Sequence, residues 1–148
     1  MLSGMIPPRW VLRLLWAIHK GIDRLTGGRI GSVRPSGRRL GTLFVISTGR
    51  SSGQPRRNPV YYVEEGPNLI VVASNAGAAA DPAWWQNLQA QPEAAVEIGG
   101  QQRPVRARVA TLAEQARLWP RFVRGSANLS QYQANTERKL SVVILEPR

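Results

Sequence analysis

Six short runs of β-branched, aliphatic and aromatic residues occupy this chain from residue 42 onward, and they limit the folds that it can adopt. Each run is five to eight residues long, the length of a strand rather than of a buried helix. The predicted strands are Thr42–Thr48, Pro59–Glu64, Leu69–Ser74, Ala94–Ile98, Arg103–Ala110 and Leu140–Leu145. Turn residues at Glu65–Asn68 and Gly99–Gly100 join two pairs of them as hairpins. This arrangement favours a small antiparallel barrel over a doubly wound sheet.

Two helices are predicted between these strands. Pro82–Gln91 follows Asp81, an expected N-cap, and has proline in its first turn. Leu112–Arg124 follows Thr111, and Glu114 completes the pattern of a capping box. The sequence therefore predicts an α+β fold, in which a six-stranded, mostly antiparallel barrel carries two inserted helices.

The first 41 residues differ from the rest and form a predicted N-terminal region. Residues 10–25 have an apolar stripe at spacings of three and four, with basic residues opposite, which predicts an amphipathic helix. Two interpretations stay open: this helix packs on its own barrel, or residues 9–25 bind an anionic membrane surface. Residues 27–41 are rich in Gly and Arg and predict a basic linker. The barrel domain is expected at residues 42–148.

Composition excludes several kinds of chemistry. The chain has no cysteine and a single histidine, His19, which rules out disulfides, thiol catalysis and multi-histidine metal sites. No GxGxxG or GxxxxGK[ST] motif occurs between a predicted strand and a predicted helix. If the protein is an enzyme, a bound cofactor is expected to supply the reactive group.

The net charge of +11 lies almost entirely in residues 1–57. Such asymmetry predicts an anionic partner, either a phosphorylated cofactor, an acidic lipid or a nucleic acid. Nucleic acid is not expected, because no recognition helix or basic aromatic strand face is evident. The chain has neither an apolar stretch of transmembrane length nor a clear signal peptide. We therefore expect a cytoplasmic protein, with peripheral binding to the inner face of the cell membrane left open.

The segment Thr48–Arg57, between the first two predicted strands, is the strongest candidate site. It contains two glycines, three hydroxyl side chains and three arginines. Glycines permit tight turns in which backbone N–H groups converge, and arginine binds phosphate or carboxylate through paired hydrogen bonds. The segment predicts an anion-binding loop; an exposed hairpin loop with no ligand is the alternative interpretation.

Three motifs occur in order along the chain. The first is Thr48-Gly49-Arg50-x-Ser52-Gly53-x-Pro55-Arg56, followed by Pro59-Val60-Tyr61-Tyr62. The second is Ala73-Ser74-x-x-Gly77, followed by Asp81-Pro82-x-Trp84-Trp85-x-Asn87-Leu88-x-Ala90-x-Pro92. The third is Tyr132-Gln133-x-x-Thr136-x-Arg138, before the last strand. In this order, the three motifs resemble those of the deazaflavin (F420)-dependent nitroreductase family, within the split β-barrel flavin and deazaflavin oxidoreductases.

The resemblance implies a split β-barrel that binds coenzyme F420 and passes a hydride from its reduced form to an electron-poor small molecule, such as a quinone or nitroaromatic compound. The cofactor-binding residues that it implies are Thr48, Gly49, Arg50, Ser52, Gly53, Arg56, Arg57, Asn58, Val60, Tyr62, Ala73, Ser74, Gly77 and Asn87. The residues of the Thr48–Arg57 loop would hold the cofactor phosphate. The residues at positions 60–62 and 73–77 would lie beside the deazaflavin ring. Ser74 and Tyr132 are the implied catalytic residues, Tyr132 as a proton donor.

Several of these residues also suit purely structural roles. Trp84, Trp85 and Leu88 fit core packing better than ring stacking. Tyr132 also fits a surface cap, and Ser74 a strand end.

The chain departs from the family pattern at several positions. Ser51 and Ala80 stand where active members commonly have lysine, and Arg57 is expected to replace part of that charge. Ser126 and Leu129 stand where the family has tyrosines. The departures imply weaker cofactor binding and an altered substrate pocket.

Two alternatives remain within the same fold. One is a membrane-associated member that binds a fatty acid or lipid-like ligand instead of the cofactor. The other is an enzyme that uses FMN in place of F420. The oligomeric state stays open.

Overall fold

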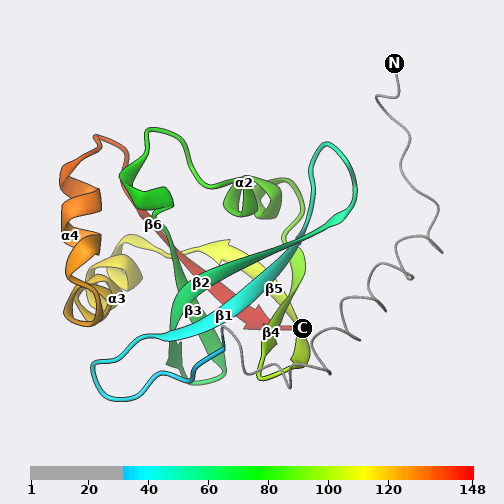
Figure 1. Cartoon of the computed structure of the whole chain (residues 1–148), viewed down its shortest axis with the longest axis horizontal. Coiled ribbons are helices and arrows are strands. Elements are labelled where there is room, and N and C mark those ends of the chain that lie inside the picture. The colour runs from blue at the N-terminus through cyan, green and yellow to red at the C-terminus, as the bar shows by residue number, and fades with distance from the viewer. Residues whose placement is uncertain (1–31) are drawn as a thin grey trace.

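The computed structural model describes residues 32–148, so the helix predicted at residues 10–25 lies outside the described residues. Six strands pair antiparallel with their neighbours and close into a barrel in the order β1-β2-β3-β6-β5-β4 (Figure 1). They are β1 (Gly41–Thr48), β2 (Pro55–Glu65), β3 (Asn68–Ala73), β4 (Glu93–Ile98), β5 (Gln101–Val109) and β6 (Ser141–Pro147). The predicted antiparallel barrel is confirmed; the main difference is that β2 begins four residues earlier than expected.

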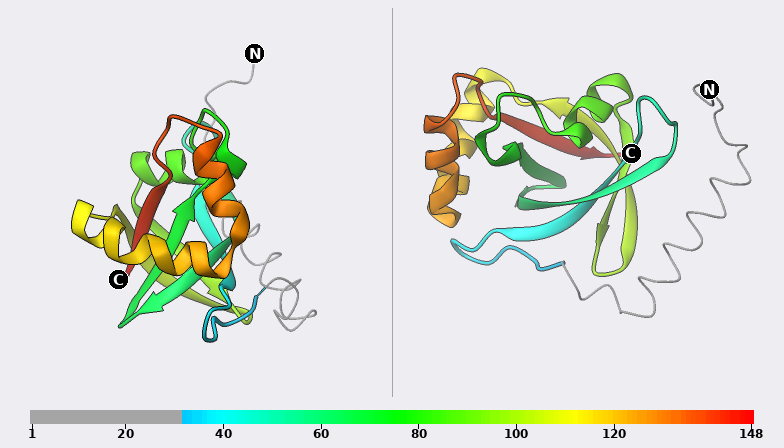
Figure 2. Two further views of the ribbon diagram at one scale, coloured as in Figure 1. Left: turned by 90° about the vertical axis from the view of Figure 1, so that its left-hand side faces the viewer. Right: turned by 45° about the horizontal axis from the view of Figure 1, so that its top comes forward.

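Helical segments lie between the strands: η1 (Asn75–Gly77), α2 (Ala83–Ala90), α3 (Leu112–Gly125) and α4 (Ala127–Ala134). Figures 1 and 2 show α3 and α4 together on one flank of the barrel, whereas α2 lies across one end. The two predicted helices are confirmed as α2 and α3. The short polar helix α4 is an addition to the predicted elements.

Strands β3 and β6 are buried on both faces, which explains their unbroken apolar sequences. In β3, Leu69 and Val71 belong to the core inside the barrel, and Ile70 and Val72 belong to a second core under the flanking helices. The helix side of this second core is formed by Leu118 and Phe122 of α3 and Leu129 of α4. Because successive side chains of β3 point to opposite faces of the sheet, this one strand contributes to both cores.

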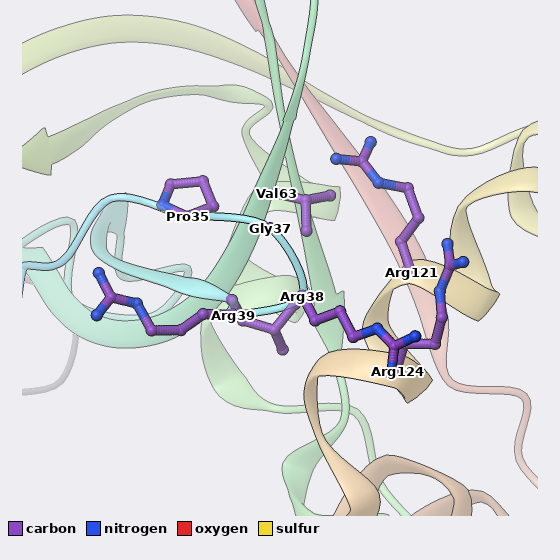
Figure 3. A pocket seen from close by; sticks show the side chains of 8 residues that line it. Pro35, Gly37, Arg38, Arg39, Val63, Arg121 and Arg124 are labelled. Carbon is purple, nitrogen blue, oxygen red and sulfur yellow. The ribbon is translucent and has the colours of Figure 1, made fainter.

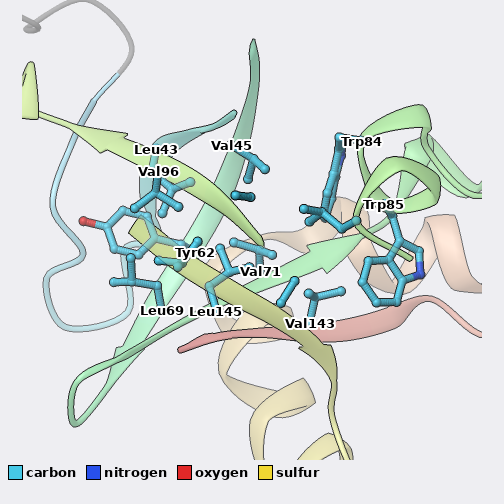
Figure 4. Close-up of a cluster of buried hydrophobic side chains, with 14 of the residues drawn as sticks. Leu43, Val45, Tyr62, Leu69, Val71, Trp84, Trp85, Val96, Val143 and Leu145 are labelled. Carbon is cyan, nitrogen blue, oxygen red and sulfur yellow. The ribbon is translucent and has the colours of Figure 1, made fainter. Parts of the chain in front are cut away.

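The barrel interior is filled by aliphatic side chains around Tyr62, and α2 closes one end with Trp84 and Trp85 (Figure 4). These tryptophans and Leu88 pack in the core, as expected. Tyr62 is fully buried, and its hydroxyl has no hydrogen-bond partner among the described residues. Burial raises the pKa of the Tyr62 hydroxyl, so the group stays protonated at neutral pH.

The helix caps include one confirmed and one wrong prediction. Thr111 caps α3: its Oγ1 accepts from the Glu114 N–H at 3.2 Å, and its own N–H donates to Glu114 Oε1 at 2.9 Å. Asp81 does not cap α2, because Pro82 is the cap residue. The Asp81 carboxylate instead accepts a hydrogen bond from Arg138, 57 residues further along the chain.

The described part of the predicted basic linker is bonded to the barrel. Val33 pairs with Thr42 at the start of β1, and Ser36 pairs with Arg39 across a tight turn. Within residues 32–148, no helix is long and apolar enough to cross a bilayer. The same residues contain no cluster of three His, Asp or Glu side chains that is arranged to hold a metal ion.

Candidate active site

The loop between β1 and β2 is a compact turn. The Gly49 N–H donates to the Gln54 carbonyl at 2.7 Å, and the Gly53 N–H donates to the Gly49 carbonyl at 2.8 Å. Gly53 has a φ of 69°, in the left-handed region that glycine tolerates. A Cβ at Gly49 would lie only 2.5 Å from Ser52 Oγ. Both glycines are therefore required for this turn.

Asn87 joins the turn to α2 and β1. Its Oδ1 accepts hydrogen bonds from the Arg50 backbone N–H at 3.2 Å and from Arg50 Nη1 at 2.9 Å. Its Nδ2 donates to Ser47 Oγ at 3.2 Å. Asn87 and Ser47 are both buried, so water does not compete strongly for these bonds. Asn87 thus fixes the backbone and the guanidinium of Arg50 together.

A polar hollow of about 280 Å³ opens beside the turn. Its lining consists of Gly49, Arg50, Ser51, Ser52, Arg56, Asn58, Ala83 and Asn87. Arg56 Nη2 donates to Ser52 Oγ at 3.3 Å, which places a second guanidinium in the same hollow. No carboxylate belongs to this set of lining residues. The hollow is therefore suited to a phosphate or a carboxylate group.

A larger hollow of about 430 Å³ adjoins the first. The two share Asn58 and Ala83, so they form one groove with a polar end and an apolar end. The apolar end is lined mainly by Pro59, Val60, Tyr61, Val72, Ala76, Pro82, Trp84, Phe122 and Leu129, with polar groups from Ser74, Asn75 and Tyr132. The groove can therefore hold a flat aromatic ring next to an anionic group.

The groove lies where β2 and β3 separate. Strand β1 pairs with β2 along Pro55–Tyr62, but β3 pairs with β2 only along Tyr62–Glu65. The second edge of β2 before Tyr62 therefore has no strand partner in the described part of the chain. Backbone groups on this edge are available to hydrogen-bond a ligand in the groove.

Arg138 holds the segment that forms another wall of the groove. Its guanidinium donates to the carbonyls of Ala73, Ser74 and Ala78 at 2.9–3.1 Å and to Asp81 Oδ1 at 2.9 Å. Only 15% of the Arg138 side chain is exposed. One partly buried cation thus binds the carbonyls of a segment that has left β3, and it sets the position of Ser74.

The same segment is packed closely against α4. Asn75 and Ala76 have φ values of 45° and 53°, which are strained for residues with a side chain. Gly77 has a φ of 77°, and a Cβ there would lie 2.5 Å from the Tyr132 carbonyl oxygen. Glycine therefore permits the close contact that brings Tyr132 to the same groove as Ser74.

The predicted site residues divide into three groups. Those that line the groove are Gly49, Arg50, Ser52, Arg56, Asn58, Val60, Ser74, Asn87 and Tyr132. Thr48 ends β1, Gly53 lies in the turn after it and Gly77 lies in η1, and none of the three lines the groove. Tyr62 and Ala73 do not line the groove either, because both side chains are fully buried in the barrel core.

The Arg57 side chain also does not line the groove. Its Nε and Nη2 lie 2.8 and 2.7 Å from Glu97 Oε2, and its guanidinium lies 3.4 Å from the centre of the Phe44 ring. Successive residues of a strand face opposite sides, so Arg57 lies on the other face of β2 from Arg56 and Asn58. Arg57 therefore does not line the polar hollow in this structure, in contrast to Arg50 and Arg56.

Several groove residues are absent from the set of predicted site residues. Pro59 and Tyr61 flank Val60 on β2, and Phe122 and Leu129 reach the groove from the flanking helices. Trp84 belongs to the core and lines the groove as well. Of the departures from the family pattern, Ser51 and Leu129 line the groove, whereas Ala80 and Ser126 do not.

A barrel that opens between two strands, with arginines at one end of the opening and apolar side chains at the other, defines a cofactor-binding split β-barrel. Residues 16–147 match the family described as F420H(2)-dependent quinone reductase, and this chain belongs to that family. The match confirms the resemblance to deazaflavin-dependent oxidoreductases and identifies coenzyme F420 as the cofactor.

Individual relatives agree with this assignment. The Mycobacterium tuberculosis protein Rv3178 is 44% identical over 107 residues, covering 72% of this chain and 90% of its own. The F420H(2)-dependent quinone reductase Rv1261c of the same organism is 33% identical over 141 residues, covering 93% of this chain and 91% of its own. A solved F420-H2 dependent reductase, FDR-A, superposes with a TM-score of 0.64 at 31% identity, over 71% of this chain and 93% of that one.

Proposed function

We propose that this chain transfers a hydride from F420H2 to a quinone, with both molecules bound in the groove. The observation that carries this proposal is the continuity of the groove. Its arginine-lined end and its apolar end share Asn58 and Ala83, and Ser74 and Tyr132 both face the apolar end. A cofactor with a phosphate at one end and a flat ring at the other fits that order.

The polar end fits the phosphate of F420. Arg50 is held in place by Asn87, and Arg56 by Ser52, so two guanidiniums are positioned before a ligand arrives. Ordering these side chains in advance lowers the entropy lost on binding. Ser51 lines the same hollow in place of a cation, which is consistent with weaker phosphate binding than in family members that have lysine there.

The apolar end fits a quinone. Val72, Phe122 and Leu129 contribute aliphatic and aromatic surface, and Trp84 lies beside them as a further flat wall. Leu129 stands where the family has a tyrosine, so this wall has lost a hydroxyl. The change favours an apolar aromatic acceptor over one that requires a hydrogen bond from this side.

Bound F420H2 supplies the hydride, and the protein's own task is to position the acceptor and deliver a proton. A quinone that gains a hydride needs one proton to become a quinol. We assign this proton to Tyr132 Oη and a hydrogen bond to the acceptor oxygen to Ser74 Oγ. The Arg138 contacts and the glycine at position 77 keep both residues at the groove.

The proposal is tested by titrating the purified chain with F420 and following tryptophan fluorescence, because Trp84 lines the groove. Arg50→Gln should weaken F420 binding about tenfold or more, since it removes a charge-assisted contact. Arg103→Gln is the matched control, because Arg103 is exposed on β5 and does not line the groove. Turnover with F420H2 and a soluble naphthoquinone completes the test.

Two outcomes would replace the proposal. A yellow protein with a flavin absorbance spectrum would identify FMN as the resident cofactor. Absence of F420 binding together with a copurifying fatty acid, identified by mass spectrometry, would favour the lipid-binding alternative.

We also propose that residues 9–25 bind an anionic membrane surface, which brings the groove near membrane-dissolved quinones. The support is the amphipathic pattern and the basic composition of this segment alone. The full chain should cosediment with vesicles that contain phosphatidylglycerol, and the double variant Arg13→Glu with Lys20→Glu should lose this binding. Equal binding by both proteins would contradict the proposal.

A further inference from the structure

A second arginine-lined hollow lies away from the groove, between the turn that precedes β1, strand β2 and the end of α3 (Figure 3). Its volume is about 200 Å³, and it shares no lining residue with the groove. The lining contains Arg38 and Arg39 from the turn and Arg121 and Arg124 from α3, with Pro35, Gly37, Leu40 and Val63. We name it the Arg38–Arg124 hollow.

The turn that carries Arg38 is fixed against the end of α3. Ser36 and Arg39 exchange two backbone hydrogen bonds of 3.1 and 2.9 Å, and Gly37 between them has a φ of 57°. A Cβ at Gly125 would lie 2.7 Å from the Arg38 carbonyl oxygen, so the turn and the helix end are in close contact. The backbone that bears these arginines is therefore well defined.

The arginines of this hollow have few partners of their own. The side chains of Arg38 and Arg124 make no hydrogen bond or ion pair with residues 32–148. Arg39 donates to the Arg34 carbonyl at 3.3 Å, and Arg121 donates to the Glu64 carbonyl at 3.2 Å. In Figure 3, Arg38 extends toward the end of α3, whereas Arg39 points away from it.

The nearest carboxylate does not neutralise the hollow. Glu64 pairs with Arg34 at 3.7 Å and does not line the hollow, and Glu65 pairs with Arg117 on the exposed side of α3. The side chains of Arg38, Arg121 and Arg124 thus lie at one hollow, and none of its lining residues is a carboxylate. Their mutual repulsion is unfavourable unless an anion is bound.

The C-terminal end of α3 explains the presence of only two of the four arginines. Cations are favoured near the C-terminus of a helix, which accounts for Arg121 and Arg124 in the last turns of α3. It does not account for Arg38 and Arg39, which come from a separate turn packed against that end. The helix end carries about half a negative charge, which opposes an anion but is outweighed by the charges of Arg38, Arg121 and Arg124.

We propose that the Arg38–Arg124 hollow binds a phosphate group. Arginines from two elements, Arg38 from the turn and Arg121 and Arg124 from α3, suit the several oxygens of a phosphate, because each guanidinium can offer paired hydrogen bonds. The phosphate can belong to a free anion or to the headgroup of an acidic lipid. Both sources present the same chemistry to the protein, and the experiment separates them.

The test is a titration of the full 15N-labelled chain with inorganic phosphate, followed by NMR. Amide shifts should move at residues 36–40 and 121–125, apart from the shifts that phosphate causes at the β1–β2 turn. The double variant Arg38→Gln with Arg124→Gln should weaken the first set about tenfold, because two charge-assisted contacts are lost. Its amide spectrum also reports whether the fold is intact.

Arg103→Gln is the control, since it removes the same kind of charge from an exposed position on β5. Unmoved amides at residues 36–40 and 121–125 in the wild-type chain would overturn the proposal. Equal weakening by Arg103→Gln would overturn it as well, because the effect would then be one of net charge alone.

Vesicles of phosphatidylcholine, with and without phosphatidylglycerol, distinguish the two sources. A lipid headgroup is the ligand if the double Arg38 and Arg124 variant loses cosedimentation with the anionic vesicles. A free phosphate is the ligand if phosphate shifts the hollow's amides and the variant cosediments like the wild-type chain. Each result supports the site and names its source.

Discussion

Arginines line two hollows along β2, and the protein holds them differently. In the groove, Arg50 donates to Asn87 and Arg56 donates to Ser52, so both guanidiniums have fixed partners. In the Arg38–Arg124 hollow, the two named arginines have no such partners within residues 32–148. Arg50 and Arg56 are positioned by uncharged polar groups, which leave their charges available to a ligand. Arg38 and Arg124 are positioned only by the backbone to which they are attached.

The surroundings of the two hollows differ as much as their arginines. The polar end of the groove continues into apolar space beside Trp84, whereas the Arg38–Arg124 hollow is small and separate. Only the groove therefore has room for both a phosphate and a ring. An arginine cluster by itself indicates an anion, and the adjoining apolar surface decides whether a cofactor fits.

The largest effect that separates the two hollows is expected at Arg138. Arg138→Gln leaves the carbonyls of Ala73, Ser74 and Ala78 and the carboxylate of Asp81 without their donor, which should destabilise the fold by about 3 kcal/mol. F420 binding should weaken with it, while phosphate binding at the Arg38–Arg124 hollow should persist. Urea denaturation and F420 titration measure the two effects.

Lys139→Gln is the control for Arg138, because Lys139 is its exposed neighbour. It should change the free energy of unfolding by no more than about 0.5 kcal/mol. An Arg138→Gln variant with the stability and F420 affinity of the wild-type chain would show that the Ser74 segment does not depend on this arginine.

A smaller effect is expected at Asn87. Asn87→Asp places a carboxylate beside Arg50, which should occupy its guanidinium and repel a phosphate. F420 affinity should fall more than in Asn87→Ala, by about tenfold. Asn87→Asp keeps an acceptor for the two Arg50 hydrogen bonds, whereas Asn87→Ala removes it, so a lower affinity in the Asp variant can be assigned to its added charge. Equal affinities in the two variants would argue against a phosphate at this end of the groove.

An added positive charge in the polar hollow is expected to strengthen cofactor binding. Ser51→Lys introduces a cation into the lining of the polar hollow and should tighten F420 binding by about threefold to tenfold at low salt. The gain should shrink as ionic strength rises. Gln101→Lys, at an exposed position on β5, adds the same charge away from the groove, and it should leave the affinity unchanged. Tighter binding in both variants would point to a general charge effect.

The smallest effect concerns Arg108, an arginine committed to ion pairs. Its side chain bonds both oxygens of Glu114 at 2.7 and 2.9 Å and lies 3.1 Å from Glu146. The hydrogen bond from Arg108, helped by the Thr111 N–H, lowers the pKa of Glu114 from 4.5 to about 2. This stabilisation is present above pH 4.5 and is lost as the pH falls toward 2.

Urea denaturation between pH 6 and pH 2 checks this prediction against Glu114→Gln. The wild-type chain should lose more stability across the window than the variant, by about 1 kcal/mol or less, because the pair is partly exposed. Identical pH profiles would mean that the ion pair does not form in solution.

Much of the barrel is predictable from the sequence, because each strand carries its own β-branched run and each confirmed helix its own pattern. Helix α4 is not, since its sequence ANLSQYQA has no apolar stripe and only Leu129 among its described side chains is buried. The first four residues of β2 look like loop because they hold proline and arginines. Their strand conformation comes from pairing with β1.

In the candidate site, too, features set by neighbouring residues are predictable from the sequence, whereas features set by distant contacts are not. The β1–β2 turn is predictable because its glycines and arginines are local in sequence. The side-chain environments of Tyr62 and Arg57 are not predictable locally because they depend on distant partners: Tyr62 is buried in the barrel core, and Arg57 bonds to Glu97, 40 residues away. The role of Arg138 is also not predictable from the neighbouring sequence, because Arg138 donates hydrogen bonds to carbonyls 60–65 residues earlier in the chain.

The central claim is that the groove, and not the Arg38–Arg124 hollow, binds the cofactor. The most direct measurement compares F420 titrations of the wild-type chain, Arg50→Gln and the double variant Arg38→Gln with Arg124→Gln. Arg50→Gln should bind about tenfold more weakly or worse, and the double variant should bind like the wild-type chain. Normal binding by Arg50→Gln, or a loss confined to the double variant, would contradict the account.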